Sequence, residues 1–233
     1  MRHTDVVREL DKKSSKKKAE SSSRFFKTEP GQYGHGDIIR GVTVPEMRLI
    51  AKQFQALSLL EVAELLRSKI HEHRYTALLI MVSAYEKSSE KIRQNIVDLY
   101  LSNLKYVNNW DLVDTSASCI LGQHLNSKKR TVLRKLAKSE SMWKRRVAIV
   151  STYHFIKQND LKDTLEISKL LLKDSEDLIH KAVGWMLREV GKKDVKVLKH
   201  FLDKYIKIMP RTTLRYAIER FPESERQHYL KSK

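Results

Sequence analysis

A weak internal repeat of about 35 residues is the feature that most constrains how this chain can fold. Its clearest copies are the pairs Val113-Asp114, Val147-Ala148 and Val183-Gly184, whose valines lie 34 and 36 residues apart. Thr76-Ala77 lies 37 residues before the first of them. A period of this size is typical of stacked helix pairs, because one pair alone cannot bury its apolar face. The repeat therefore predicts an all-α solenoid with each pair on an equivalent helix.

The spacing of apolar residues and the low content of Gly and Pro also indicate helices. From Pro45 onward, apolar residues recur every three or four positions, as on one face of an amphipathic helix. The chain has 7 Gly and 4 Pro among 233 residues, which is too few for the turns of an all-β fold. The expected helices cover residues 45–55, 58–68, 72–86, 90–105, 110–125, 128–138, 142–158, 160–173, 176–191, 194–208 and 211–220.

We expect a single HEAT-like repeat domain over residues 1–233. Residues 1–30 are rich in Lys and Ser and by composition alone suit a basic arm, yet Val6, Val7 and Leu10 have helical spacing. Four of the seven glycines lie in the segment 31–44, which predicts the longest irregular connection. Its spacing lacks the Walker pattern of a phosphate loop. Residues 45–220 hold the repeats, and residues 221–233 are expected as a C-terminal tail.

The formal net charge of +18 favours a polyanionic partner, and nucleic acid is the leading candidate. No apolar stretch is long enough to span a bilayer, and no signal-peptide pattern follows Met1. The single cysteine, Cys119, rules out an internal disulfide and fits a reducing cytosol. We therefore expect a cytoplasmic protein that does not act at a membrane.

One repeat differs from the others at a position where a polar residue suggests a functional site. The second position of the pair is small in three repeats, as Ala77, Ala148 and Gly184, and is Asp114 in the fourth. A carboxylate inside a helix is costly to desolvate unless it is paired or faces a cleft. Trp110 precedes Asp114 by four residues, so both side chains leave the same helix face one turn apart. A paired or locally solvated aspartate remains the alternative to a functional one.

Two repeat-equivalent helices offer complementary groups. One carries Lys144-Arg145-Arg146, and the other carries Lys181, Trp185 and Arg188 at i, i+4 and i+7. Arg146 directly precedes the repeat valine and is expected nearest to a cleft. Its neighbours Lys144 and Arg145 are expected on a solvated face.

The run His71-Glu72-His73 has residue types that bind metals. Residues two apart on a helix diverge widely, however, and no zinc spacing such as His-Glu-x-x-His is present. We therefore expect roles at a helix start and on the surface, and no metal.

Several longer segments identify a protein family more specifically than the single residues above. They are Phe25-Phe26-Lys27-Thr28, Pro30-Gly31-Gln32-Tyr33, Gly36-Asp37, Gly41-Val42-Thr43-Val44-Pro45, Trp110-Asp111-Leu112-Val113-Asp114, Trp143 with Arg146, and Lys181-Ala182-Val183-Gly184-Trp185-Met186-Leu187-Arg188-Glu189. With them the chain resembles, over nearly all of its length, the bacterial DNA alkylation repair glycosylases built from HEAT-like repeats. The resemblance implies a right-handed α-solenoid with a concave basic DNA-binding face, and helices within residues 1–28.

The resemblance also assigns site residues. In that family the first Trp and last Asp of the W-D-x-V-D motif, the Arg after the next motif's Trp, and the Trp of G-W-x-L-R-E line the lesion site. Carried over, these are Trp110, Asp114, Arg146 and Trp185. An early aromatic that helps line the site in some members points to Phe25. Lys181 and Arg188 are expected to contact DNA beside Arg146.

The function implied is hydrolysis of the N-glycosidic bond of cationic N3- or N7-alkylated purines in duplex DNA. Asp114 would stabilise the oxocarbenium-like sugar. We expect no cofactor, no obligate protein partner and a monomer. The alternatives are a non-catalytic paralogue that binds bent, branched or damaged DNA by shape, and a helical-repeat scaffold for an acidic protein.

Overall fold

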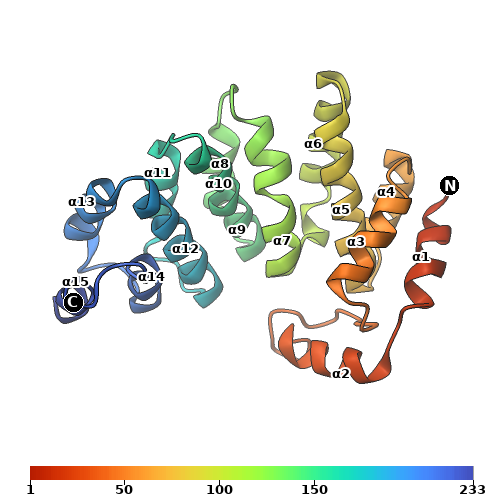
Figure 1. The fold of residues 1–233 in the computed structure, drawn as a ribbon, viewed down its shortest axis with the longest axis horizontal. Coiled ribbons are helices and arrows are strands. Elements are labelled where there is room, and N and C mark those ends of the chain that lie inside the picture. Colours follow the sequence, from red (N-terminus) through yellow and green to blue (C-terminus); the bar gives the residue numbers. More distant parts are fainter. Residues whose placement is uncertain (233) are drawn as a thin grey trace. The chain divides into compact units, whose positions relative to one another are not determined.

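The computed structural model describes residues 1–232 and is built from helices (Figure 1). Within these residues the β-interactions are limited to an isolated parallel bridge between Ile38 and Ile70. The all-α prediction is confirmed. None of the described helices combines the length and the apolar character that crossing a membrane requires. The single repeat domain, the right-handed solenoid and its concave basic face remain predictions.

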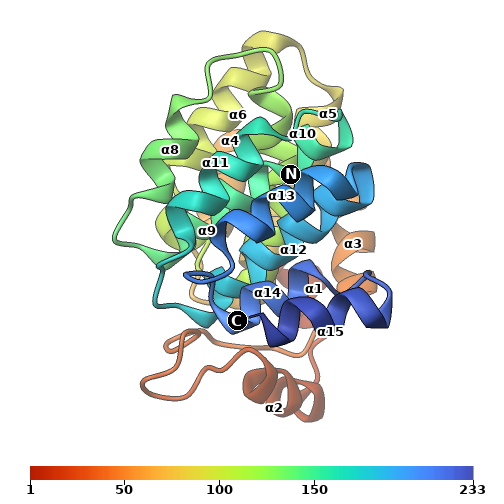
Figure 2. The same cartoon turned by 90° about the vertical axis from the view of Figure 1, so that its left-hand side faces the viewer.

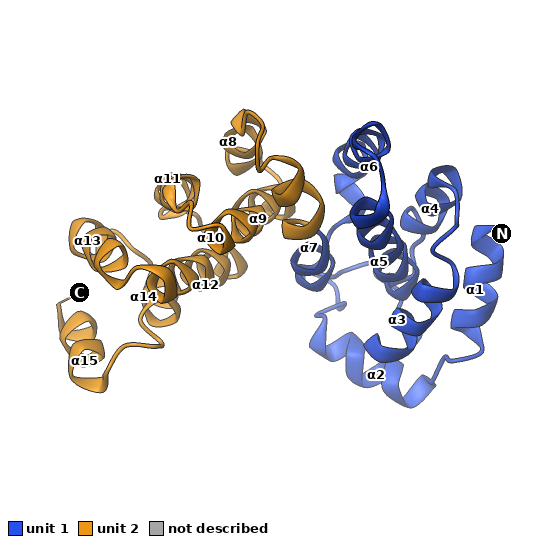
Figure 3. Cartoon of the chain, turned by 45° about the horizontal axis from the view of Figure 1, so that its top comes forward, with its two compact units in different colours: residues 1–116 blue, residues 117–233 orange. Residues whose placement is uncertain are grey.

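The described chain divides into two compact units, with the boundary between Ser116 and Ala117 (Figure 3). Unit 1 contains α1 (His3–Asp11), α2 (Lys16–Phe25), α3 (Val44–Gln53), α4 (Leu59–Leu66), α5 (His71–Lys87), α6 (Glu90–Ser102), the short 3-10 helix η1 (Leu104–Tyr106) and α7 (Trp110–Ser116). Helix α5 is its centre, because α3, α4, α6 and α7 all pack against it.

Unit 2 begins with a π-helical segment, η2 (Ser118–Gly122). It continues with α8 (Thr131–Ala137), α9 (Met142–Ser151), α10 (Tyr153–Lys157), α11 (Lys162–Leu171), α12 (Asp177–Lys193), α13 (Val195–Tyr205), α14 (Arg211–Ala217) and α15 (Glu223–Lys231). Helix α12 is the centre of this unit and packs against α9, α11, α13 and α14.

The repeat positions are core positions. Val113, Val147 and Val183 are at most 1% exposed, and Thr76 is fully buried. They lie on α7, α9, α12 and α5, and the repeat helices pack on one another within each unit, α5 on α7 and α9 on α12. The periodic valines therefore mark helix interfaces, which is the role that the repeat predicted.

The N-terminal segment folds as helices joined to the repeats. Helix α1 buries Val6 and Leu10 and packs against α3 and α4, which confirms the helical spacing of its apolar residues. Helix α2, in contrast, has no buried residue. The glycine-rich segment after it is irregular as expected, and Gly31, Gly36 and Gly41 adopt positive φ.

The helix predicted over residues 110–125 is interrupted. Helix α7 ends at Ser116, and the N–H of Gly122 then donates to the carbonyl of Ala117 at 2.9 Å, the five-residue step of a π-helix. Gly122 lies against the backbone carbonyl of Ser151, and a Cβ at this position would collide with it. Close packing inside unit 2 therefore accompanies the change in helical pitch.

The segment 221–233, expected as a tail, contains helix α15. Pro222 directly precedes its first residue, and Glu223 and Glu225 lie in its first turn, where acidic side chains favour a helix. Tyr229 is its single buried residue and donates through its hydroxyl to Asp203 at 2.9 Å. With one apolar anchor, the helix shows no amphipathic period that sequence reasoning could detect.

Candidate functional site

Helix α7 carries the W-D-L-V-D motif in unit 1. The backbone N–H of its first residue, Trp110, donates to the side chain of the buried Asn109 at 2.8 Å, which fixes the start of the helix. Trp110 and Asp114 are both half-buried and lie one turn apart on this helix, as predicted from their spacing. The carboxylate of Asp114 is thus held on a short, well-anchored helix.

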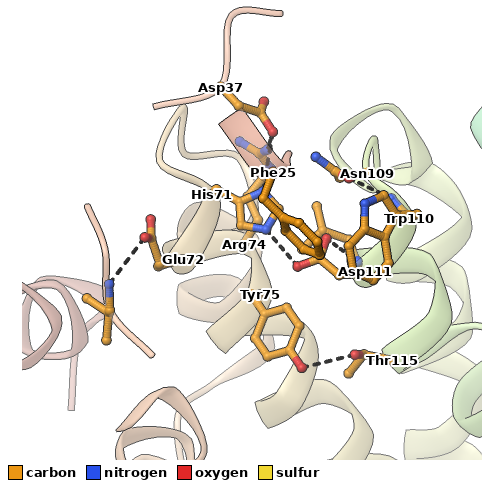
Figure 4. A network of polar contacts seen from close by, with 12 residues as sticks. Phe25, Asp37, His71, Glu72, Arg74, Tyr75, Asn109, Trp110, Asp111 and Thr115 are labelled. Atoms are coloured by element: carbon orange, nitrogen blue, oxygen red, sulfur yellow. Dashed lines mark hydrogen bonds and ion pairs between the residues drawn. The ribbon is translucent and has the colours of Figure 1, made fainter. Parts of the chain in front are cut away.

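Two phenylalanines from the end of α2 pack around Trp110, and Figure 4 shows Phe25 against the indole. The Phe25 ring meets the indole edge-on at 5.5 Å between centroids, and the Phe26 ring lies at 5.6 Å. Phe25 is 62% exposed, although its ring is in contact with those of Phe26 and Trp110. The structure therefore places Phe25 beside Trp110 with much of its side chain exposed.

A buried charge network lies under this aromatic cluster (Figure 4). His71, the first residue of α5, contacts a carboxylate with each ring nitrogen: Nε2 lies 2.8 Å from Asp111 and Nδ1 lies 3.3 Å from Asp37. Arg74 donates to the same Asp37 oxygen at 2.6 Å. The Phe26 ring covers the imidazole at 4.5 Å. The network joins the glycine-rich connection, α5 and α7.

The electrostatics of the network favour its charged form. Burial alone would lower the pKa of His71, but its hydrogen bonds to Asp111 and Asp37 outweigh burial and raise the pKa to about 9. Burial opposes ionisation of Asp37, and its hydrogen bonds to His71 and Arg74 outweigh that effect and lower its pKa. At neutral pH His71 is therefore an imidazolium that donates to two carboxylates.

The expectation for His71-Glu72-His73 was half right. The run does start a helix, but the surface role is wrong, because all three residues are at most 5% exposed. The carboxylate of Glu72 accepts the backbone N–H groups of Arg40 and Gly41 at 2.9 and 2.7 Å. In the described part of the chain, no group of three or more His, Cys, Asp or Glu side chains is arranged to hold a metal ion.

In unit 2, Arg146 is nearly enclosed. It is 5% exposed, and its Nη1 donates to the carbonyl of Leu178 in the first turn of α12 at 2.5 Å. Trp185 is half-buried, and its indole lies 5.9 Å from the Tyr153 ring. The structure thus anchors Arg146 on α12, the helix that carries Trp185.

Arg145 is not on a solvated face, which corrects the expectation made from the basic run. Its side chain is 14% exposed and its Nε donates to Asp174 at 2.5 Å. Its Nη1 donates to the carbonyl of Ser139, six residues back, as Arg74 does to Ser68. Arg74 and Arg145 each stand three residues before the small repeat position. The hydrogen bond from the arginine to the carbonyl six residues earlier therefore recurs with the repeat.

The two other basic candidates on α12 have acidic partners. Lys181 pairs with Asp177 at 2.8 Å and remains 41% exposed. Arg188 is 18% exposed and pairs with Glu219 and Glu189. Both residues are thus paired with carboxylates, and Lys181 is the more exposed of the two.

Sequence reasoning missed the roles of Asp37, His71, Arg74 and Asp111. Their contacts span 34 to 40 residues along the chain, so no local motif shows them. The separation is close to the repeat period, and this was the available signal: residues one period apart on stacked helices become neighbours.

Comparison with known proteins supports a repair function. The model of a family described as DNA alkylation repair enzyme matches residues 6–221. Among solved structures, a predicted DNA alkylation repair enzyme from Enterococcus faecalis is similar, with a TM-score of 0.71 and 17% sequence identity. The similarity covers 91% of this chain and 98% of the Enterococcus chain and, at this identity, shows a shared fold. No curated protein matches.

Proposed function

This chain belongs to the DNA alkylation repair enzyme family, and within it we propose that the protein is an alkylpurine DNA glycosylase. Its substrate would be duplex DNA that carries a cationic purine alkylated at N3 or N7. The reaction would be hydrolysis of the bond between that base and its deoxyribose.

The single observation that carries the proposal is the half-buried carboxylate of Asp114, one turn from the indole of Trp110, whose neighbour Phe25 is exposed. The equivalent repeat position is small and buried elsewhere, as Ala77 and Ala148. A carboxylate here interrupts an apolar pattern, which is the kind of local conflict expected at a functional site.

The substrate chemistry needs little more than such a carboxylate. A purine alkylated at N3 or N7 already carries a positive charge, so it leaves without being protonated. The C1′–N bond breaks with its electron pair going to the base, which becomes neutral, while C1′ becomes oxocarbenium-like. A fixed carboxylate stabilises this cation more strongly than water does, because it is already oriented.

In this mechanism Asp114 has two tasks. It stabilises the developing sugar cation, and it orients a water molecule whose oxygen bonds to C1′ and whose proton passes to the carboxylate or to solvent. Loss of one such electrostatic group typically slows a reaction by about 10²-fold or more.

The other residues position the DNA. The indoles of Trp110 and Trp185 would stack against the cationic nucleotide or its sugar, each contact being worth on the order of 1 kcal/mol. Arg146 would hold α12, which carries Trp185, through its hydrogen bond to the Leu178 carbonyl, and its small exposed edge would contact a phosphate near the lesion. Phe25 and Lys181 would add further contacts to the DNA, and Arg188 would contribute less because it is less exposed than Lys181.

The test is release of labelled methylpurines from methylated duplex DNA by the wild-type protein and by Asp114→Asn. A sample without protein corrects for spontaneous loss of cationic bases. DNA affinity and helix content are measured in parallel. We expect the variant to release bases about 10²-fold more slowly or worse, while binding changes by no more than a few fold.

A matched control is Asp98→Asn, which removes the same charge from an exposed position on α6. It should leave base release unchanged. Binding without release by the wild-type protein would identify a non-catalytic binder of damaged or branched DNA instead. Release by Asp114→Asn at the wild-type rate would remove Asp114 from the mechanism.

A further inference from the structure

Helix α2 contributes nothing to the core. It has no buried residue, and its sequence contains three consecutive serines and only two apolar residues, Ala19 and Phe25. Figures 1 and 2 both show α2 and the connection after it set apart from the other helices of unit 1. A ten-residue helix of this composition would be marginal in isolation. Its order must come from contacts at its ends.

Both ends of α2 are fastened. At the start, the N–H of Ser15 donates to the carbonyl of Arg40 at 2.9 Å. Gly41 lies so close to the first turn of α2 that a Cβ would come within 2.5 Å of the Ala19 nitrogen. At the end, Phe25 and Phe26 pack on Trp110. The helix is therefore attached to the surface of unit 1 at both ends, and its last residue touches the candidate site.

The helix presents positive charge that forms no ion pair within the described chain. Its basic residues and the lysine that follows it are all exposed, and in the described chain none of them forms an ion pair: Lys16, Lys17, Lys18, Arg24 and Lys27. The single acidic residue of α2 is Glu20. Several arginines of unit 2, in contrast, are paired with carboxylates, as Arg130 is with Asp163 at 2.7 Å.

The position of the lysines within α2 is also unfavourable for the helix. Lys16, Lys17 and Lys18 occupy the first turn, where the helix dipole is positive and acidic side chains are favoured. Each of these lysines is unfavourably placed with respect to the helix dipole when no anion is bound. A partner that supplies negative charge along the helix would offset this unfavourable interaction.

We propose that α2 is a docking element for the phosphate backbone of duplex DNA, placed so that bound DNA runs past Phe25 toward Trp110. The choice of DNA as the polyanion rests on the proposed function. The surface itself supports it, since α2 lacks the apolar face that a membrane or an acidic protein helix would need. Regularly spaced phosphates, in contrast, are bound by charge alone.

The test is the salt dependence of binding to a short undamaged duplex by the wild-type protein and by the triple variant Lys16→Gln, Lys17→Gln, Lys18→Gln. Each lost phosphate contact lowers the slope of log affinity against log salt by about 0.9. We expect the slope to fall by about 2 to 3, and the affinity at moderate salt to fall by roughly tenfold or more.

The chain offers a control with the same change of charge. Lys169, Lys196 and Lys204 are exposed on α11 and α13 of unit 2, and their triple change to Gln should alter the slope by less than about 1. The triple change of the α2 lysines to Arg keeps the charge and should retain the wild-type slope. Helix content and thermal unfolding are compared for all variants.

The outcomes separate this inference from the proposed function. Equal slopes for the α2 variant and the wild-type protein would overturn the docking role, whether or not the protein releases bases. An equal loss in the α11 and α13 control would also overturn it, because the effect would then be one of net charge. A reduced slope in a protein that never releases bases would support the docking role and reject the glycosylase.

Discussion

The imidazole of His71 lies 2.8 Å from the carboxylate of Asp111 and thereby ties the start of α5 to the first turn of α7. Asp111 stands between Trp110 and Asp114 in the chain, so the contact holds the helix that carries both candidate residues. The second ring nitrogen binds Asp37, whose other partner is Arg74. Because the Phe26 ring covers the imidazole, the same residue also supports the aromatic cluster.

The first prediction concerns stability against pH. The folded-state pKa of His71, about 9, lies above its ordinary value of 6.5, so its stabilising contribution is complete below about pH 6.5. It is lost as the pH rises through about 9. The groups facing the ring are Asp37 from the connection, Arg74 from α5 and Asp111 from α7. We expect the wild-type advantage over His71→Gln to shrink by on the order of 3 kcal/mol across this range.

Urea unfolding of both proteins between pH 6 and 10 measures this difference. His35→Gln, in the exposed part of the glycine-rich connection, is the control and should follow the wild-type curve. If the gap between the wild-type protein and His71→Gln is the same at pH 6 and pH 10, the imidazolium is not what holds the network together.

Much of the fold was predictable because it depends on local pattern. The valines of the repeat, such as Val147 and Val183, recur with a fixed period and are buried at helix interfaces. The spacing of Trp110 and Asp114 placed both on one face of a helix, and α7 has them there. In each case the physical cause, burial of one helix face, acts on residues close together in the sequence.

The features that were missed depend on tertiary contacts. Arg145 belongs to a basic run that looks solvated, but its ion pair with Asp174, 29 residues away, makes it structural. His71 resembled a surface residue until Asp37 and Asp111 were brought to it over 34 and 40 residues. A polar residue's role is set by its partner, and the partner is not visible in the local sequence.

The second prediction concerns two glycines on α12. A Cβ at Gly184 would lie 2.5 Å from the Cβ of Tyr216 and 2.6 Å from the backbone oxygen of Thr213 on α14. Because backbone cannot move aside, Gly184→Ala should lower the free energy of unfolding by about 2 kcal/mol or more. At Gly191 the obstructing atom is the end of the flexible Leu198 side chain.

Gly191→Ala is therefore the matched control. The better helix propensity of alanine, about 1 kcal/mol, should offset the cost of moving one leucine methyl group. Chemical unfolding of both variants decides the point. Equal losses at the two positions would show that the helices α12 and α14 do not approach as closely at Gly184 as described.

The third prediction separates the two phenylalanines that meet Trp110. Phe25 is 62% exposed, so Phe25→Ala should change the free energy of unfolding by less than about 0.5 kcal/mol. It should slow base release by roughly tenfold if its ring stacks on the DNA, since such stacking is worth about 1 to 3 kcal/mol. Phe26 is half-buried between His71 and Trp110, so Phe26→Ala should lower stability by about 2 kcal/mol.

Single-turnover release of methylpurines and urea unfolding, measured on the same preparations, test this division. Phe25→Tyr keeps the ring and should keep the rate, which distinguishes stacking from a general effect of substitution. The assignment of Phe25 to the DNA would be wrong if Phe25→Ala releases bases at the wild-type rate. It would equally be wrong if Phe25→Ala unfolds as readily as Phe26→Ala, because its ring would then serve the packing of Trp110 alone.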